Sequence, residues 1–347
     1  MTLRIAVCLP QVPFEHGGAE ILAQGLVDAL AERGHRSSLV TVPFRWSPNV
    51  DLLQNALIWR LLDLTESNGA PIDLVIGTKF PSYLVRHPRK VIWLFHQFRQ
   101  AYDLHGTHLA QFADDPEGSA MREAVRKMDA RAFGECRAAF AISENVAARL
   151  RKYNGLEAGV LRPPAQRLDL AWRGDDGYVL SVGRLDLAKR NDLLLEALAL
   201  MPDASAVIVG DGPDQARLRG LARSLGLNGR VRFAGRVAEE ELADLYGRCR
   251  AVFYAPHDED HGFVPTEAHL AEKPVVTTTD AGGPLEVVRD GETGLVVEPN
   301  AESIAAGLRR LLEDARLSRR LGAAGAPEAR MLNWDHVVTT LVESAVA

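Results

Sequence analysis

Residues 178–199 read YVLSVGRLDLAKRNDLLLEALA, and this stretch indicates the fold class. It begins with a short apolar run, passes through a charged loop and ends in leucines and alanines at helical spacing. A strand that leads into a helix is the repeating unit of α/β proteins. Near-continuously apolar strands are typical of parallel sheets covered on both faces, so we expect helices on each side of the sheet.

The same alternation of strand and helix runs along the chain in two series. In the first half, the helical stretch AEILAQGLVDALAERG follows the first of the apolar runs LRIAVCL, SLVTV, DLVIG, KVIWLF and AAFAI. The second half contains YVLSVG, SAVIVG, VRFAG, AVFYA, PVVTT and GLVVE. We therefore predict two doubly wound, Rossmann-like α/β domains. Pro163 and Pro164 favour an extended connector, which places the domains at residues 1–165 and 166–332.

Length and composition fit this division. A chain of 347 residues is about right for two domains, and 47% hydrophobic with 25% charged residues is typical of a soluble globular protein. No stretch approaches the roughly 18 apolar residues that a membrane span needs, and the N-terminus lacks a signal-peptide pattern. We therefore expect a cytoplasmic location. The scattered Cys8, Cys136 and Cys249 support neither a disulfide framework nor a cysteine zinc site.

Charge is distributed unevenly. Residues 1–165 carry a balance of +2 and the remainder −8, which together give the net charge of −6. Between Asp73 and Asp103 there is no acid, and cations alternate with aromatic residues. The favoured interpretation is a buried strand with a solvated basic flank; the alternative is a face for an anionic partner such as lipid phosphates. Nucleic acid is not an expected partner, because the whole chain is acidic.

Loops at the carboxyl ends of parallel strands are the expected place for a ligand. Gly17 and Gly18 follow the first strand and either allow an anion to approach the next helix or form a simple flexible turn. Neither GGAE nor GDGPDQ matches the G-x-G-x-x-G dinucleotide fingerprint, which disfavours a nicotinamide enzyme.

Three cations gather in the loop of the opening stretch. Gly183 and Arg184 follow the strand, and Lys189 and Arg190 precede a helix whose expected N-cap is Asn191. Solvated surface charge is one interpretation. The position after a strand favours the other, which is charge-assisted binding of a diphosphate.

The stretch EDHGFVPTE, residues 259–267, places Glu259 in a loop and Glu267 in the first turn of a helix expected from Pro265. A metal site, a glycosidase-like acid pair and a sugar-nucleotide clamp are all compatible with two acids at this spacing. His257 and His261 suggest a metal, but no ligand set of established spacing emerges. Further on, two glycines in DAGGPLEVV precede a helix that could face an anion.

Seven motifs in order resemble the retaining glycosyltransferases of family 4, also called glycosyl transferase group 1. They are GGAE, GRLDLAKR, GDGP, EDHGFVPTEA, KPVV, AGGPLEVV and DGETGLVVEP. The resemblance spans nearly the whole chain and implies the GT-B fold of two facing Rossmann-like domains. It also implies that residues 333–347, which follow an expected break at Pro327, form a helix that crosses back to the N-terminal domain with Trp334 as its anchor.

The resemblance also implies roles for individual residues. Arg184 and Lys189 bind the donor diphosphate, Glu267 binds the ribose, and Glu259 binds the donor sugar. His96 reaches the transferred sugar, so the implied catalytic residues are His96, Arg184, Lys189 and Glu259. The nucleotide base lies near 235–237. The implied donor-binding residues are Gly17, Gly18, Gly183, Arg184, Lys189, Arg236, Val237, Glu259, Gly262, Phe263, Val264 and Glu267.

The implied reaction is retaining transfer of a hexose from a UDP- or GDP-linked sugar to a glycan or lipid-linked acceptor in cell-surface polysaccharide biosynthesis. It needs no metal and no cofactor besides the donor, and it implies peripheral contact of the N-terminal domain with the inner face of the plasma membrane. Alternatives are a GT-B sugar phosphorylase, a sugar-nucleotide epimerase and a non-enzymatic sugar-nucleotide binder. The sequence departs from the family pattern at His261, beside the sugar pocket, and at Glu272, where a glycine is usual.

Overall fold

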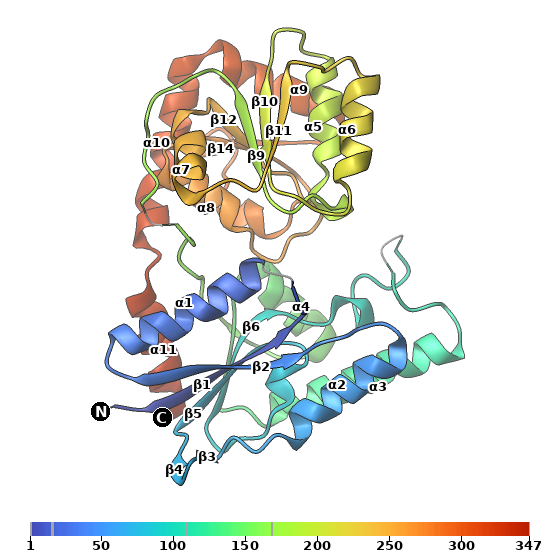
Figure 1. Cartoon of the computed structure of the whole chain (residues 1–347), viewed down its shortest axis with the longest axis vertical. Coiled ribbons are helices and arrows are strands. Elements are labelled where there is room, and N and C mark those ends of the chain that lie inside the picture. Colours follow the sequence, from blue (N-terminus) through green and yellow to red (C-terminus); the bar gives the residue numbers. More distant parts are fainter. Residues whose placement is uncertain (1, 15–16, 108–109, 168, 347) are drawn as a thin grey trace. The chain divides into compact units, whose positions relative to one another are not determined.

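The chain consists of two compact units. The computed structural model describes residues 2–14, 17–107, 110–167 and 169–346. Contacts divide the chain into unit 1, Met1–Pro163 with Asn333–Ala347, and unit 2, Pro164–Leu332 (Figure 1). The boundary falls between the two prolines that the sequence marks as a connector, and the expected boundary lay two residues later.

Unit 1 is built on a parallel sheet whose described strands follow the order β2-β1-β5-β6-β7-β8. These strands are β1 (Arg4–Gln11), β2 (Arg36–Pro43), β5 (Leu74–Lys79), β6 (Lys90–His96), β7 (Ala138–Ala141) and β8 (Gly159–Val160). A small antiparallel hairpin, β3 (Glu66–Ser67) and β4 (Ala70–Pro71), stands apart from this sheet. The helical elements are α1 (Gly18–Glu32), α2 (Asn49–Leu61), η1 (Ser82–Leu84), η2 (Arg99–Ala101), α3 (Pro116–Gly134) and α4 (Glu144–Asn154).

Unit 2 repeats this architecture with the order β11-β10-β9-β12-β13-β14. Its strands are β9 (Val179–Val182), β10 (Ala206–Val209), β11 (Val231–Gly235), β12 (Ala251–Phe253), β13 (Val275–Thr278) and β14 (Gly294–Val297). Its helical elements are η3 (Leu187–Lys189), α5 (Asn191–Ala199), α6 (Gln215–Ser224), α7 (Glu239–Arg248), α8 (Phe263–Leu270), η4 (Gly283–Glu286), α9 (Ala301–Glu313) and α10 (Ala315–Met331).

Alternate strand residues enter two separate cores, one on each face of the unit 2 sheet. Ile208 and Phe253 pack with residues of α5, α6 and α9, whereas Leu180 and Val252 pack with residues of α7 and α8. Helices therefore cover both faces (Figure 1), and this explains why the strands are apolar at nearly every position. The predicted fold class, two parallel-sheet Rossmann-like domains, is confirmed.

The direction of the strand order reverses once in each sheet. In unit 2 the chain moves from β9 outward to β11 and then returns to the other side of β9 to form β12. In unit 1 the corresponding reversal lies between β1 and β5. In doubly wound sheets, ligands bind outside the carboxyl ends of the strands at such a reversal. The topology thus points to the loops after β9 and β12 as the place for a ligand in unit 2.

The C-terminal helix α11 (Trp334–Val346) returns to unit 1, as expected (Figure 1). It contacts α1 and β6, and the ring centroids of Trp334 and Trp93 lie 6.2 Å apart. Space for the indole depends on a glycine, because a Cβ at Gly25 would lie 2.8 Å from it. The expected break at Pro327 is wrong. This proline lies inside α10, and the chain leaves the helix at Leu332.

The aromatic residues between Asp73 and Asp103 belong mainly to the core of unit 1. Phe80, Tyr83, Trp93 and Phe95 are buried, and so is Lys90, whose ammonium donates to the carbonyls of residues 83 and 85 at 3.0 and 3.1 Å. The favoured interpretation of a buried strand therefore holds, and this stretch does not form an exposed face of alternating cations and aromatic rings.

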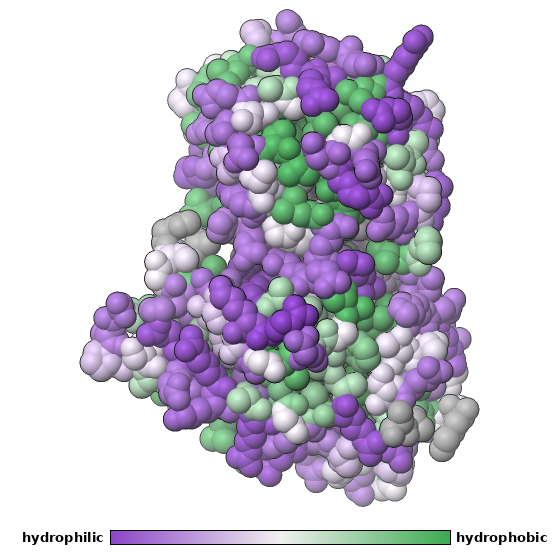
Figure 2. Space-filling view, turned by 180° about the vertical axis from the view of Figure 1, so that it is seen from behind, coloured by the Kyte–Doolittle hydropathy of each residue, from purple (hydrophilic) through white to green (hydrophobic). Residues whose placement is uncertain are grey.

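None of the described helices is both long and apolar enough to cross a bilayer. The face in Figure 2 is largely hydrophilic and has hydrophobic patches in both units.

Candidate functional site

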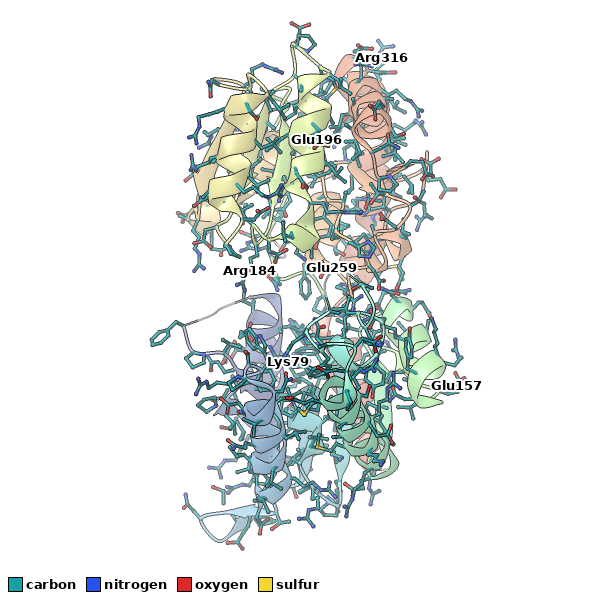
Figure 3. All side chains as sticks on the ribbon, turned by 90° about the vertical axis from the view of Figure 1, so that its right-hand side faces the viewer. Lys79, Glu157, Arg184, Glu196, Glu259 and Arg316 are labelled. Atoms are coloured by element: carbon teal, nitrogen blue, oxygen red, sulfur yellow. The ribbon has the colours of Figure 1, made fainter. Side chains whose placement is uncertain are left out.

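The loops after β9 and β12 meet at the strand-order reversal of unit 2. Figure 3 shows Arg184, from the first loop, and Glu259, from the second, at the same end of this unit. Every strand of the sheet is parallel to its neighbours, so the loops after β10, β11 and β13 emerge at this edge too. The residues of unit 2 that the sequence predicts therefore lie together at the carboxyl ends of the strands.

Two glycines after β10 determine how closely the loops pack. A Cβ on Gly210 would lie 2.0 Å from the Gly183 carbonyl oxygen, and one on Gly212 would lie 2.3 Å from the Leu185 carbonyl oxygen. Gly183, Gly210 and Gly212 also have positive φ values of 148°, 120° and 158°. The GDGP motif therefore lets the β10 loop pass directly over the backbone of the β9 loop, a packing role that explains its glycines without a dinucleotide.

Lys189 and Glu259 form an ion pair across the strand-order reversal. Their side chains are 21% and 22% exposed, so both remain open to a ligand. The Tyr254 hydroxyl lies 3.3 Å from the Lys189 ammonium, whose nitrogen is 5.6 Å from the centre of the tyrosine ring. Burial disfavours the charge on Lys189, but the Glu259 carboxylate outweighs it and holds the pKa of the lysine above its ordinary value.

Arg190 was expected to be one of three cations that bind the diphosphate, but its guanidinium has a structural role. Its guanidinium donates to both oxygens of Asp280 at 2.7 and 2.8 Å and to the carbonyls of Ala255 and Pro256 at 2.8 and 2.9 Å. Burial raises the pKa of Asp280, but Arg190 outweighs this and lowers it to about 2. Arg190 thus fixes the β12 loop, and with φ of +50° it is also the N-cap of α5, a place we expected Asn191 to take.

Arg184 remains the exposed cation of the β9 loop. Its backbone carbonyl accepts from the Asp186 amide at 3.1 Å, and the Asp186 carboxylate in turn accepts from the Lys189 amide at 3.1 Å. The loop is therefore held by its own short hydrogen bonds, so that Lys189 is directed at Glu259 while Arg184 stays at the surface.

Helix α8 begins at Phe263, two residues earlier than expected. Its N-cap is Gly262 with φ of +75°, where a Cβ would lie 2.8 Å from the Tyr254 ring. No described side chain caps this helix, so the amides of Phe263 and Val264 are at positions that lack intrahelical partners. An anion could bind there, close in sequence to Glu259.

Glu267 consequently lies in the second turn of α8 and not in the first. It is only 2% exposed, accepts from the Tyr246 hydroxyl at 2.8 Å and pairs with Arg167 at 2.9 Å. Burial raises the pKa of Glu267, and the Arg167 charge opposes that rise. The two glutamates therefore differ: Glu259 is partly open to solvent, whereas Glu267 is buried with both carboxylate oxygens already engaged.

The loops after β11 and β13 complete this edge. Arg236 pairs with Asp211 at 2.9 Å, Val237 is half-buried, and the Gly235 carbonyl accepts from the Gly210 amide at 2.8 Å. After β13, Gly283 lies against the backbone of Asp260. The helix expected there is only the single 3₁₀ turn η4, because Gly282 adopts φ of +74° and the chain closes tightly on Glu259.

The remaining predicted residues belong to unit 1. Gly17 caps α1, and its amide donates to Glu20 at 2.9 Å; Gly18 is the first residue of the helix. The other Glu20 oxygen accepts from Lys79 at 2.9 Å, which ties α1 to the end of β5 at the reversal of this sheet. His96 ends β6 with Nδ1 2.8 Å from the Gln97 carbonyl oxygen.

Sequence reasoning missed several residues that shape the site. Tyr254 ends the apolar run AVFYA, so its position directly before the acidic loop could have suggested it. Arg167 and Tyr246 lie 100 and 21 positions from Glu267 and carry no local signal. Within the described ranges, no three His, Cys, Asp or Glu side chains gather as metal ligands, and metal independence stays a prediction.

Comparison with known proteins points to one family. Residues 164–327 match the family model of "Glycosyl transferases group 1", so the match covers unit 2 almost completely. A D-inositol 3-phosphate glycosyltransferase from Thermomonospora curvata is 35% identical over 208 residues, which cover 56% of this chain and 47% of the relative. One from a Nocardioides species is 33% identical over 205 residues, 52% of this chain and 44% of the relative. The chain thus spans about half the length of these relatives.

Solved structures with the same architecture cover both units. Sucrose-phosphate synthase from Thermosynechococcus elongatus has a TM-score of 0.79 at 20% identity, with 98% of each chain covered. Anabaena Alr3699/HepE in complex with UDP-glucose has a TM-score of 0.73 at 18% identity, again with 98% of each chain covered. At these identities the likeness establishes the fold, which is that of GT-B glycosyltransferases.

Proposed function

We propose that this chain, whose second unit matches the group 1 glycosyltransferases, transfers a hexose from a nucleotide-diphosphate sugar to an acceptor hydroxyl with retention of configuration. The observation that carries the proposal is the Lys189–Glu259 pair at the strand-order reversal of unit 2, directly before the uncapped start of α8. A cation, a carboxylate and two helix-terminal amides at this edge suit a diphosphate with a sugar attached.

In this proposal the donor takes the place of Glu259 as the partner of Lys189. The diphosphate takes over the Lys189 ammonium and the amides of Phe263 and Val264, and this leaves the Glu259 carboxylate to accept from a sugar hydroxyl. Arg184 supplies a further cation from the loop surface. Glu267 binds the ribose through the second lone pairs of the oxygens that accept from Arg167 and Tyr246, and the loop at 235–237 holds the base.

The bond between the anomeric carbon and the diphosphate oxygen breaks, and the acceptor oxygen bonds to the same face of that carbon. The acceptor proton moves to the departing diphosphate. Because negative charge grows on the leaving group, Lys189 and the helix-terminal amides stabilise the transition state more than the ground state. For unit 1 we propose the roles that the resemblance implies, with His96 reaching the transferred sugar and the Gly17–Gly18 turn lying between the donor phosphate and the acceptor.

The comparisons indicate which substrates to test first. The HepE neighbour was solved with UDP-glucose, so UDP-glucose is the first donor and a GDP-linked hexose the second. Glycans and lipid-linked sugars remain the proposed acceptors, in surface polysaccharide assembly. The curated relatives are named for transfer to inositol 3-phosphate, which adds a phosphorylated polyol to the acceptors worth testing.

Contact with the inner membrane face is proposed through α2 and not through the buried 73–103 stretch. This helix turns Leu52 and Trp59 into the core and exposes a stripe on its other side. The exposed stripe consists of Val50, Leu57, Ile58 and Leu61. We expect Leu57→Ser with Leu61→Ser to reduce co-sedimentation with phosphatidylglycerol vesicles at least fivefold, and Leu200→Ser, an exposed leucine of unit 2, to leave it unchanged. Equal sedimentation of both variants would contradict the contact.

The activity test measures release of UDP or GDP from nucleotide sugars with and without acceptor. We expect Lys189→Ala to lower turnover about 100- to 1,000-fold, the typical effect of removing one group that stabilises transition-state charge. Lys127→Ala, which removes a surface lysine from α3 of unit 1, is the matched control. Turnover by Lys189→Ala equal to that of the control would reject the proposed site.

Product analysis separates the alternatives. A sugar phosphorylase consumes free phosphate and releases a sugar phosphate, and an epimerase converts the nucleotide sugar without any acceptor. A nucleotide sugar would stabilise a non-enzymatic binder against heat, but no nucleotide would be released. Thermal shift detects such binding because a ligand at about 100 times its Kd stabilises the folded state by roughly 2.7 kcal/mol.

A further inference from the structure

A cavity lies at the amino ends of the unit 2 strands, opposite the loops that form the candidate donor site. It has a volume of about 560 Å³, within the usual range of small-molecule sites. Asp175, Arg250 and Lys273 line it from segments just before β9, β12 and β13, and Arg316 and Arg320 line it from the start of α10. Figure 3 shows Arg316 at the end of the unit that is remote from Arg184 and Glu259. The cavity is therefore distinct from the candidate donor site.

The lining is strongly cationic. Five cationic side chains face two acidic ones, which leaves a net charge of +3 in the half of the chain whose balance is −8. The two acids are already engaged. Glu272 pairs with Arg319 inside the cavity and with Arg330 outside it, and Asp175 pairs with Arg250. The excess positive charge therefore resides on the other lining cations.

Those cations are Lys273, Arg316 and Arg320, none of which has an acidic group within 4.0 Å among the residues that the structure describes. Arg316 and Arg320 are exposed. Lys273 is only 3% exposed, and its ammonium donates to the neutral Gly174 carbonyl at 2.7 Å. Burial lowers the pKa of Lys273, so a nearby anion would stabilise its charged form.

Trp172, which is 46% exposed, gives the cavity an aromatic wall. The Lys273 ammonium lies 5.6 Å from the indole ring and the Arg319 guanidinium 4.8 Å from it, so the indole holds two cations of the lining in place. A set of cations beside an aromatic wall suits a phosphorylated small molecule, whose oxygens need several donors and whose remainder needs apolar contact.

We propose that this cavity binds a small phosphorylated molecule with two or more negative charges, through Lys273, Arg316 and Arg320. The site uses none of the residues proposed to bind the nucleotide sugar, and its existence does not depend on the proposed function. Binding is electrostatic at an open cavity, so it weakens as salt screens the charges.

The experiment is calorimetric titration of the full chain with inorganic pyrophosphate at low ionic strength. We expect Arg316→Ala with Arg320→Ala to weaken binding at this site at least tenfold. Both side chains are exposed, so folding is retained. Arg223→Ala removes an exposed arginine outside the cavity and is the matched control. Equal affinity of the double variant and the control would overturn the proposal.

Pyrophosphate could also bind at the donor edge, so Arg184→Ala is titrated in parallel. We expect this variant to keep the binding event that the Arg316 and Arg320 substitutions remove. Loss of all binding in Arg184→Ala would assign pyrophosphate to the donor edge alone and overturn the second site. Hydrogen exchange is a readout that needs no variant. Pyrophosphate should slow the exchange in peptides covering 315–320 and 249–251. Unchanged exchange there at saturation would contradict the site.

Discussion

Acidification from pH 8 to pH 5 should weaken unit 2 through His269. This residue of α8 is 1% exposed, with Nε2 3.1 Å from the Thr293 carbonyl oxygen. Its ring packs so closely on α10 that a Cβ at Gly325 would lie 2.4 Å from it. Burial is the largest cause that lowers the pKa of His269, from 6.5 to about 4. The Thr293 carbonyl and Glu328 oppose this shift, and Arg289 adds to it.

The sign and size follow from the proton balance. Between pH 6.5 and 4 the unfolded chain binds the imidazole proton and the folded chain does not, so the free energy of unfolding falls as the pH drops through this window. The full difference in pKa corresponds to about 3 kcal/mol, of which about 2 kcal/mol is lost at pH 5. For a urea slope of roughly 2 kcal/mol/M, the unfolding midpoint moves by about 1 M.

His269→Gln removes the titrating group and keeps an amide that can donate to Thr293. Because this variant has its own constant packing cost, the informative quantity is the change in the wild-type-minus-variant difference with pH. Urea unfolding at pH 8, 6 and 5 measures it, and hydrogen exchange of peptides from α8 assigns it to unit 2. His336→Gln, at an exposed histidine of α11, is the control.

The consequence for function is direct, because α8 also carries Phe263, Val264 and Glu267. We expect nucleotide-sugar binding to weaken below pH 6 in the wild type more than in His269→Gln. If the wild-type-minus-variant stability difference stays constant from pH 8 to pH 5, the folded protein accepts the His269 proton without cost, and the predicted pH dependence is wrong.

Three further predictions concern the scaffold. Asp129 is fully buried, and burial raises its pKa to about 7. Between pH 4 and 7 the folded chain holds the Asp129 proton and the unfolded chain does not, so the free energy of unfolding of unit 1 should fall by about 3 kcal/mol from pH 5 to 8. Asp129→Asn should abolish this fall in urea unfolding. The methyl group of Gly25→Ala would lie 2.8 Å from Trp334, so this variant should lower the free energy of unfolding by about 1–3 kcal/mol in the same measurement. Gly134→Ala, with open space around the added methyl, is the control and should not destabilise the protein. Gly210→Ala should abolish donor turnover, because its methyl would lie 2.0 Å from a carbonyl oxygen of the β9 loop; retained activity would contradict the close packing of the two loops.

Local pattern was sufficient to predict the strands and the fold class. Runs such as DLVIG and SAVIVG are apolar at nearly every position because both faces of each sheet are covered, and this signal needs no knowledge of distant residues. Helix starts were less well predicted. Asn191 was expected as an N-cap, but Arg190 occupies that place with a positive φ because Asp280, 90 positions away, holds its guanidinium.

The departure at Glu272 has a similar cause. A glycine is usual there, and the structure shows why: the residue adopts φ of +56°, a left-handed conformation that glycine reaches without strain. Glu272 adopts it while its carboxylate pairs with Arg319 and Arg330 of α10. The motif indicated the unusual position, and only the tertiary contacts account for the residue found there.

Three features follow from residues that are neighbours in the chain: the alternation of strand and helix, the division near the paired prolines, and the order of the loops that carry glycines and charges. Three pairings follow only from the folded arrangement: Lys189 with Glu259, Arg190 with Asp280, and Glu267 with Arg167 and Tyr246. These pairings depend on which strand ends lie side by side. Because the parallel strands are joined by crossover connections, charges that are far apart in sequence come together at the strand ends.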